Sequence, residues 1–508
     1  MAQDTVLGID LGTSSVRALL IDEEGVVVAS AMRTYPIHAA HPGWAEQDPD
    51  EWWEATCLAI GECRKAAPDA LIRSVSFSGQ MHGTVLLDSG GDPVRPAIIW
   101  CDQRSAAEVE AFLSTFGKDR LAEITANPLA AGFQLATLLW LRNHEADSLR
   151  DIGAVLLPKD YLRARFTGRY ATESSDACST LLFDTAHRRW SPEVIGAAHL
   201  SQAWFPPVKS ATDHVGEVAS DAARATGIPV GTPVFAGGGD LPLTAIGNGV
   251  IKPGQVLSTI GSGGQLCAPT GEPNYDPKLR THTFCHALPD RWYLMGAILS
   301  AGLSLRWLRE QVLGPDAPDY AALSANAANV PPGAEGLVFL PYLIGERTPH
   351  LDPYACGVFF GLTPRHTAAH LVRAIMEGVV FALSEGLDIM RALGINPRSV
   401  VAAGGGARSA LWRQIQADVY RCTVTTTRTE EQAAYGAALL AGVGVGWWPS
   451  VRAACAACVL PASEPLEPVE ENRKRYEELR DLYRRLYPRL RDLMAERSRL
   501  VAGGKLEP

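Results

Sequence analysis

The stretch VLGIDLGTSSVRALLIDEEGVVVAS, residues 6–30, decides how the rest of the chain is interpreted. Its apolar runs, residues 6–9, 16–21 and 26–28, predict three short strands. The turn between the first two strands carries a carboxylate, a glycine and three hydroxyls, namely Asp10, Gly12, Thr13, Ser14 and Ser15. A glycine lets backbone N–H groups approach an anion, and hydroxyls add donors. The tip of this hairpin is therefore suited to phosphate.

Asp10 gives this turn a second property. A carboxylate beside phosphates holds Mg²⁺ directly or through water, because Mg²⁺ prefers hard oxygen ligands. The alternative is an ordinary hairpin with a polar turn, and the rest of the chain has to decide between the two.

Length and composition predict a two-domain protein. The 508 residues exceed one typical core, and we place the boundary near residue 250, giving domains 1–250 and 251–508. The net charge of −10 argues against a nucleic-acid or anionic-membrane partner. The first strand begins a few residues from Met1, and glycines interrupt the longest apolar run, residues 437–448. We therefore expect neither a leader nor a membrane span, and a cytoplasmic location.

Two further glycine-rich turns follow predicted strands. Residues 256–266 (VLSTIGSGGQL) repeat the strand–turn–strand pattern of the first hairpin, and residues 399–409 place Gly404, Gly405 and Gly406 before a helix. The repeat predicts two similar domains that face each other across a nucleotide cleft. No G-x-x-x-x-G-K-[ST] motif is present, which excludes a P-loop.

Asp240 is the candidate general base. It ends the run VFAGGGD, so it is expected at a strand tip near the domain boundary, where phosphoryl transfer needs a group to accept the proton of the acceptor hydroxyl. An alternative role, the N-cap of a helix, is compatible with this one.

A small polyol could bind at two other strand tips of the first domain. Gln80, Met81 and His82 combine an amide, a thioether and an imidazole, which suits hydroxyls and carbon faces together. Trp100 and Asp102 follow the next predicted strand, residues 96–100, and could complete the pocket. For His82, Trp100 and Asp102 a purely structural role is the alternative.

Two other features favour packing over chemistry. Cys455 and Cys458 have the C-x-x-C spacing of redox and metal sites, but no second pair of cysteines has this spacing. We therefore interpret them as residues that pack a helix. The charged tail, residues 467–500, carries apolar residues at three- and four-residue steps, which predicts a helix packed on its own domain.

The chain resembles the FGGY family of carbohydrate kinases and, within it, the bacterial xylulokinases. The resemblance runs from residue 6 to about residue 441 and is carried by GIDLGTSSVRALLID, GQMHGTVLLD, AGGGD, FLPYLIGERTPH and GGGARSALWRQ. It implies an α/β fold of two ribonuclease-H-like, actin-like ATPase domains facing a central cleft. The implied reaction is phosphorylation of a ketopentose, D-xylulose first, by ATP with Mg²⁺. Homodimers are common in this family, so the resemblance leaves a homodimer open, and the sequence does not give the oligomeric state.

The resemblance also implies residue roles. The catalytic base falls on Asp240, and the acid associated with metal and phosphate falls on Asp10, with both as candidate metal ligands. Substrate contacts fall on Met81 and His82. Nucleotide contacts fall on Gly261, Ser262, Gly302, Gly405, Gly406 and Ser409, in addition to the Gly12–Thr13–Ser14 turn.

One departure from the family pattern bears on the substrate. Relatives carry an amide after the catalytic acid, whereas this chain has Leu241. D-Ribulose, 1-deoxy-D-xylulose and an alditol therefore stay open beside D-xylulose. An actin-like ATPase scaffold is the alternative from another class of protein.

Overall fold

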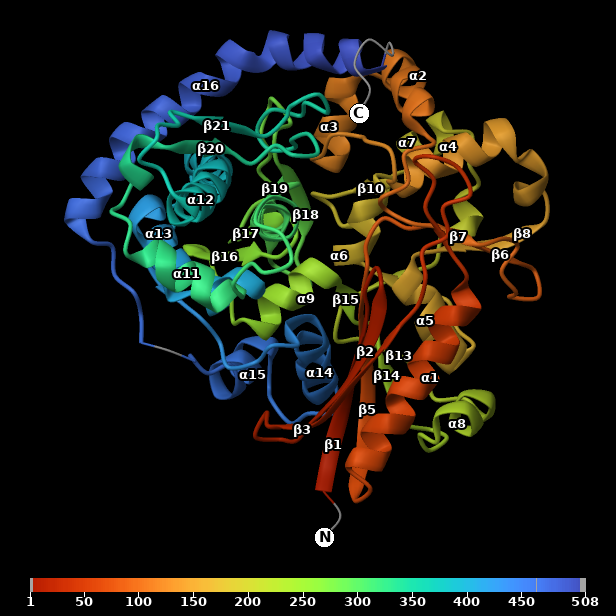
Figure 1. Ribbon diagram of the computed structural model, residues 1–508. Helices are drawn as coiled ribbons and strands as arrows, with labels where there is room; N and C mark the ends of the chain where they lie inside the picture. Colours follow the sequence, from red (N-terminus) through yellow and green to blue (C-terminus); the bar gives the residue numbers. More distant parts are fainter. Residues whose placement is uncertain (1–2, 463, 503–508) are drawn as a thin grey trace.

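Two mixed β-sheets form the frame of the computed structural model, which describes residues 3–462 and 464–502 (Figure 1). The first sheet has the order β13-β14-β5-β1-β2-β3, and β15 also pairs with β5. The strands β1, β2 and β3 are antiparallel, whereas β1, β5 and β14 are parallel. The strands are β1 (Gln3–Leu11), β2 (Ser15–Ile21), β3 (Val27–Thr34), β5 (Ala70–Gly79), β13 (His214–Glu217), β14 (Pro233–Phe235) and β15 (Gly238–Gly239).

The second sheet repeats this arrangement. Its order is β18-β19-β17-β16-β22-β23, with β19, β17 and β16 antiparallel and β16, β22 and β23 parallel. The five strands from β19 to β23 thus match those from β3 to β14 in order and direction, as the repeated hairpin predicts. The strands are β16 (Gln255–Ile260), β17 (Gly264–Thr270), β18 (His282–Cys285), β19 (Trp292–Ile298), β22 (Ser399–Ala403) and β23 (Thr423–Thr425).

Helices and small sheets surround the first sheet. The helix α1 (Pro49–Ala66) packs on β2 and β3, and its N-cap Asp48 accepts a hydrogen bond from the backbone of Asp50, as expected for a capped start. Residues 97–209 form a mainly helical region beside the sheet. Its elements are β7 (Ala97–Ile98), α2 (Ala106–Phe116), α3 (Lys118–Thr125), α4 (Gln134–His144), η1 (Ala146–Leu149), β8 (Ile152–Leu156), α5 (Pro158–Thr167), β9 (Thr172–Glu173), α6 (Ser174–Ala177), η2 (Cys178–Thr180), β10 (Phe183–Asp184), β11 (Arg189–Trp190), α7 (Pro192–Ala197), η3 (Gln202–Trp204) and β12 (Val208–Lys209). Further elements of this lobe are β4 (Glu46–Gln47), β6 (Val85–Asp88), α8 (Ser220–Thr226) and α9 (Asp240–Gly247).

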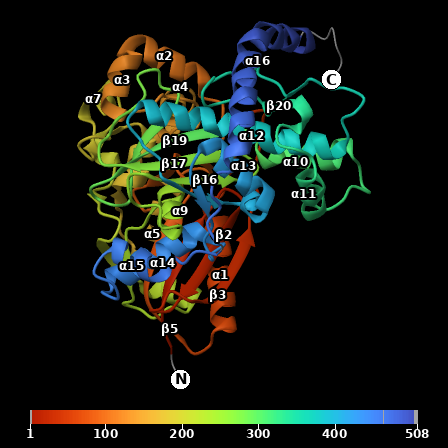
Figure 2. The same ribbon diagram turned by 90° about the vertical axis from the view of Figure 1, so that its left-hand side faces the viewer.

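The second sheet is covered by the long helix α12 (Ala368–Ala392), which packs on β17 and β19. The tail helix α16 (Glu470–Ala502) runs over α12 and α13 on the outer side of this lobe (Figure 2). It buries Tyr476, Tyr483 and Leu486, which confirms that its apolar face packs on the body. The other elements are α10 (Gly302–Trp307), η4 (Leu308–Val312), α11 (Tyr320–Ala328), η5 (Ala334–Gly336), β20 (Val338–Leu340), β21 (Val358–Phe360), η6 (Gly405–Arg408) and α13 (Ala410–Tyr420).

Two late helices return to the first sheet. The helix α14 (Gln432–Gly444) packs on β1 and β5, and α15 (Val451–Cys458) packs on α14 (Figure 1). A Cβ on Gly8 would lie 2.0 Å from the carbonyl oxygen of Ala434, so β1 needs a glycine for this close approach. Cys455 and Cys458 are buried in α15, and burial raises the pKa of both thiols, to about 12 and about 11. These cysteines are packing residues in the structure.

One predicted strand is shorter than expected. Residues 96–100 form only the two-residue strand β7, and Trp100 lies in the turn that follows it. Within the described part of the chain, no helix combines the length and apolar character needed to cross a membrane.

Candidate active site

Asp10 and Asp240 lie at the same edge of the first sheet. Asp10 pairs with Ser78 of β5, and Ser78 pairs on its other side with Gly238 of β15. Asp240 comes two residues after Gly238 and begins α9. Since neighbouring strands are about 4.8 Å apart, these pairings place the backbones of Asp10 and Gly238 roughly 10 Å apart across β5, with Asp240 two residues beyond Gly238.

The environment of Asp240 suits a base. Burial and the negative charge of Asp10 raise the pKa of its carboxyl to about 7, although a hydrogen bond from the backbone N–H of Leu241 to Oδ1 (2.7 Å) opposes this. A base works best when its pKa lies near the operating pH. The N-cap of α9 is Gly239 and Asp240 is the first residue of the helix, so the alternative N-cap role falls one residue before Asp240.

The turn after Asp10 is held from three sides. The indole Nε1–H of Trp100 donates to the Thr13 hydroxyl (2.9 Å), and the Gln47 amide donates to the Thr13 carbonyl (2.7 Å). The Tyr35 hydroxyl donates to the Gly12 carbonyl, while Ser14 is exposed at the tip. The backbone of this predicted phosphate turn is therefore fixed before any ligand arrives.

Gln80, Met81 and His82 follow β5 directly, beside Asp240. The Gln80 amide donates to Gln47 Oε1 (2.9 Å), whereas its own Oε1 is buried without a hydrogen-bond partner among the described residues. A Cβ on Gly239 would lie 3.0 Å from Sδ of Met81, which shows how closely Met81 packs against the Asp240 turn. These three residues and Asp240 thus form one group.

His82 is held in a specific state. Its φ of 73° is unusual for a residue other than glycine, and such strain is common at functional sites. Its Nδ1–H donates to the Ser179 carbonyl (2.8 Å), which leaves Nε2 as an acceptor. Burial lowers the pKa of His82 to about 4, so the ring is neutral at physiological pH.

Asp102 differs from its expected role as a sugar ligand. Its carboxylate accepts hydrogen bonds from the Arg104 guanidinium and from the backbone of Ala45 (2.6 Å), and both charged side chains are buried. These bonds occupy both carboxylate oxygens, so Asp102 holds the loop and is not free to bind a sugar. Trp100, 41% exposed, joins the site through Thr13.

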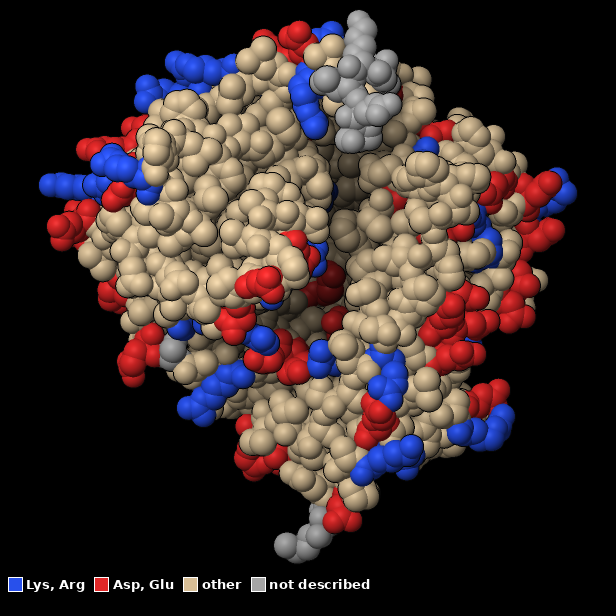
Figure 3. Space-filling model, in the orientation of Figure 1, with Lys and Arg blue, Asp and Glu red and all other residues tan. Residues whose placement is uncertain are grey.

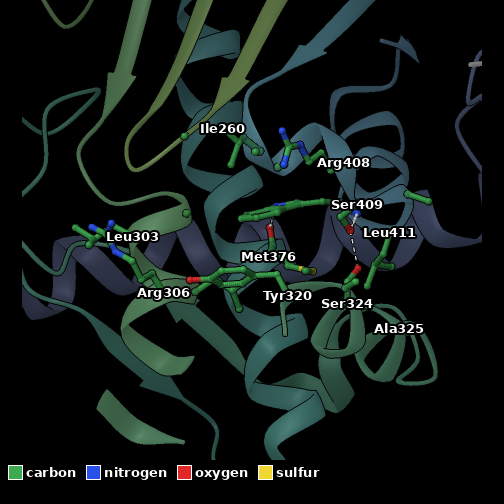
Figure 4. A pocket seen from close by; sticks show the side chains of 18 of the residues that line it. Ile260, Leu303, Arg306, Tyr320, Ser324, Ala325, Met376, Arg408, Ser409 and Leu411 are labelled. Atoms are coloured by element: carbon green, nitrogen blue, oxygen red, sulfur yellow. Dashed lines mark hydrogen bonds between the residues drawn. The ribbon is translucent and has the colours of Figure 1, made fainter. Parts of the chain in front are cut away.

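A pocket of about 760 Å³ lies on the second lobe, a volume in the range of small-molecule sites. The loop before α10, the helix α11 and the turn after β22 line it, with Ile260 and Arg408 across from Tyr320 and Ser324 (Figure 4). Its lining is largely apolar. The six predicted nucleotide residues of this lobe all line it, namely Gly261, Ser262, Gly302, Gly405, Gly406 and Ser409. The hydroxyl of Ser409 caps α13 and contacts the Ser324 hydroxyl (2.6 Å).

A second, polar pocket of about 640 Å³ connects this one to Asp10. It shares Gly405 and Arg408 with the first pocket, and Asp10, Arg17 and Thr259 also line it. Acidic side chains are visible at the bottom of the cleft between the lobes (Figure 3). The two pockets thus adjoin at Gly405 and Arg408, and the polar one reaches Asp10 of the first sheet.

The donor set fits Mg²⁺. Among the described residues, no three His, Cys, Asp or Glu side chains are grouped to bind a metal. Mg²⁺ usually binds through one or two carboxylates and the substrate's phosphates. Oδ1 of Asp10 is buried without a hydrogen-bond partner in the described residues, so a bound cation would satisfy it. Burial alone raises the pKa of this carboxyl, and a cation beside it would oppose that shift by favouring the ionised form.

Sequence reasoning missed two arginines in this path. Arg17 lies opposite Asp10 in the β1–β2 pairing, so the hairpin register could have identified it. It contacts Glu431 Oε1 at 2.9 Å and also lowers the pKa of Asp10 through its charge. Arg408 follows the third glycine turn and lines both pockets. Tyr320 of α11 belongs to no motif and carries no signal in the sequence.

Comparison with known proteins agrees with this geometry. Residues 5–247 match the N-terminal domain model of the FGGY family of carbohydrate kinases, and residues 257–445 match its C-terminal domain model. The chain belongs to the FGGY family of carbohydrate kinases. This membership confirms the fold class, two actin-like ATPase domains, and makes the chain an ATP-dependent carbohydrate kinase. The alternative of an actin-like ATPase scaffold is therefore not supported.

Several relatives that align along nearly the full length of this FGGY kinase are named xylulose kinase, and the gluconokinase of Bacillus subtilis (strain 168) is 29% identical over 94% of this chain. This chain is 39% identical to the xylulose kinase of Escherichia coli (strain K12) over 96% of its own length and 100% of that protein. It is 37% identical to the xylulose kinase of Staphylococcus epidermidis (strain ATCC 12228 / FDA PCI 1200) over 98% and 99%. The crystal structure of xylulose kinase from Rhodospirillum rubrum is 31% identical and superposes with a TM-score of 0.90, covering 97% of this chain and 100% of that one. The exact domain boundary and the site residues stay predictions, and a homodimer stays open.

Proposed function

We propose that this FGGY kinase transfers the γ-phosphoryl group of ATP to a hydroxyl of D-xylulose, giving D-xylulose 5-phosphate and ADP, with Asp240 as the general base. The observation that carries this proposal is the position of Asp240. It is a carboxyl whose pKa is raised to about 7, beside the Gln80–Met81–His82 tip and across β5 from Asp10.

The nucleotide would occupy the two connected pockets. Its base and ribose fit the apolar pocket beside Tyr320 and Met376, and its phosphates fit the polar pocket that leads to Asp10. Arg17 and Arg408 line that path, paired with Glu431 and Glu430, and their positive charge would be turned to the phosphates on binding. This local charge is needed because the protein as a whole carries a net charge of −10.

The sugar would bind at the tip of β5. Nε2 of neutral His82 and the unpartnered Oε1 of Gln80 can each accept a hydrogen bond from a hydroxyl. Met81 offers an apolar surface to the carbon chain. Leu241, 7% exposed, gives the residue after the base an apolar side chain, and for this reason the preference among related sugars needs a direct test.

The chemical step needs little covalent work from the protein. Asp240 takes the proton from the attacking hydroxyl as its oxygen bonds to the γ-phosphorus and the bond to the bridging oxygen of ADP breaks. Asp10 is the principal candidate ligand of Mg²⁺, with Asp240 as the second. When bound, Mg²⁺ would offset the charge of the phosphate oxygens.

A substrate panel tests the proposal. ADP release is measured with D-xylulose, D-ribulose, 1-deoxy-D-xylulose, D-gluconate and xylitol at equal concentrations. We expect the largest kcat/KM for D-xylulose. A larger value for another member of the panel would contradict the proposed substrate, and no sugar-dependent ADP release would contradict the proposed reaction.

A further inference from the structure

A short buried segment, Glu173–Ser179, lies between the Asp240 turn and His82. It ends β9, continues through α6 and enters η2. The side chains of Ser175, Asp176 and Ser179 have no exposed surface. The segment contacts both the turn that carries Asp240 and the sugar-binding His82.

Ser175 holds the turn that carries the base. Its Oγ accepts a hydrogen bond from the backbone N–H of Gly239 (3.2 Å) and donates to Oε1 of Glu173 (2.8 Å). Gly239 directly precedes Asp240 and is the N-cap residue of α9. The Ser175 hydroxyl therefore fixes the backbone from which the Asp240 carboxylate projects.

Ser179 holds the sugar-binding histidine. Its Oγ accepts a hydrogen bond from the backbone N–H of His82 (3.1 Å), and its carbonyl accepts one from His82 Nδ1 (2.8 Å). These two bonds secure a residue with a strained positive φ and determine which ring nitrogen is left to accept a hydrogen bond.

Buried charges fix the segment itself. Glu173 accepts hydrogen bonds from the backbone N–H groups of Ser175 (2.7 Å) and Asp176 (2.8 Å). Lys159 contacts Asp160 at 2.6 Å and Asp176 at 3.5 Å, and all three of these side chains are buried. Buried ion pairs add little net stability, but removing one partner is costly, so such a network restricts movement.

We propose that Glu173–Ser179 is a positioning element that joins the base to the sugar-binding histidine, with Ser175 acting on Asp240 and Ser179 acting on His82. The inference rests on the proposed function, because it assigns the two serines to the two halves of that reaction. Loss of the Ser175 hydroxyl should misplace the base and leave the sugar contacts intact. Loss of the Ser179 hydroxyl should loosen His82 and weaken sugar binding.

The test separates kcat from KM in the full-length enzyme. Ser175→Ala should lower kcat about tenfold, the effect of a 1.4 kcal/mol change in barrier, and change the KM for D-xylulose less than twofold. Ser179→Ala should raise the KM for D-xylulose about fivefold or more and leave the KM for ATP unchanged.

Ser191→Ala is the matched control. Ser191 is a buried serine of the same lobe whose hydroxyl caps α7, so its loss lowers stability without touching either group. If Ser175→Ala fails to fold, Ser175→Thr compared with Ser175→Val carries the same test, because the two differ only in the hydroxyl.

The outcomes are distinguishable. Equal effects of Ser175→Ala and Ser179→Ala on kcat and KM, or effects no different from those of Ser191→Ala, would overturn the positioning role. Normal turnover by Asp240→Asn would instead overturn the proposed function. An inactive Asp240→Asn together with unaffected serine variants would remove only the present inference.

Discussion

Asp10 on β1 and Asp240 at the start of α9 lie on either side of β5, and the charge of Asp10 adds to burial in raising the pKa of Asp240 to about 7. We propose that these two carboxyl groups divide the work of phosphoryl transfer. One carries a buried oxygen that is free for a cation, and the other is poised to exchange a proton near neutral pH.

The pH profile should report Asp240. Because the base acts when deprotonated, kcat/KM for the sugar should fall as the pH decreases through about 7, approaching tenfold for each further pH unit. The measurement is initial rate from pH 5.5 to 8.5 at saturating MgATP. A profile that stays flat down to pH 5.5 would mean that no group with this pKa is needed.

Asp240→Asn should stabilise the ligand-free protein. The pKa of Asp240 is higher in the folded chain than its ordinary value of 3.8, so the folded state binds more protons than the unfolded state between about pH 4 and 7, and stability falls as the pH rises through that range. Removing the charge should raise the free energy of unfolding by on the order of 1–3 kcal/mol at pH 8, and Tm by about 2 °C or more. The gain should shrink toward pH 5, whereas exposed Asp481→Asn should show none. A lower Tm for Asp240→Asn at pH 8 would contradict this account.

Ala325→Trp should block the nucleotide without affecting the sugar. Ala325 lies on α11 and lines the apolar pocket (Figure 4), so an indole there would fill part of the 760 Å³. We expect the KM for ATP to rise at least tenfold, with sugar affinity unchanged by calorimetry. Asn326→Trp, one residue along the same helix and outside the pocket lining, is the control. Equal effects of the two substitutions would place the nucleotide elsewhere.

Arg17→Met should weaken binding of the ATP phosphates. Arg17 lines the polar pocket beside Asp10, and a charge-assisted hydrogen bond contributes about 1.5–3 kcal/mol, so kcat/KM for ATP should fall about ten- to a hundredfold. Arg33→Met is the comparison, because Arg33 lies on the neighbouring strand β3 and pairs with Glu62 outside the pocket. If the two variants behave alike, Arg17 does not contact the phosphates.

Glycine turns and strand patterns predicted which residues the fold brings together. The repeated hairpin foretold two matching sheets, and the acids at strand ends placed Asp10 and Asp240 in one group, because parallel strands such as β1 and β5 bring their carboxyl ends to the same edge. The six glycines and serines predicted for the nucleotide all line one pocket.

The features that the sequence patterns did not predict depend on contacts between residues far apart in the chain. For Asp102 a sugar contact and a structural role are both compatible with the sequence. The nearby Arg104 pairs with it inside the loop, which fits the structural role, and no local pattern distinguishes the two. The return of α14 to β1 depends on a long-range contact at Gly8, which sequence periodicity does not contain. The roles proposed for Ser175 and Ser179 depend on contacts with Gly239 and His82 that only the fold creates.

The most direct test is a single-turnover measurement of phosphoryl transfer to D-xylulose by Asp240→Asn, with ATP and sugar binding measured on the same preparation. General-base catalysis contributes about 10²–10⁴-fold, so we predict a loss of transfer of that size or more, with both affinities kept within a few-fold. Transfer within tenfold of the unaltered enzyme, in a variant that still binds both substrates, would contradict the central role of Asp240.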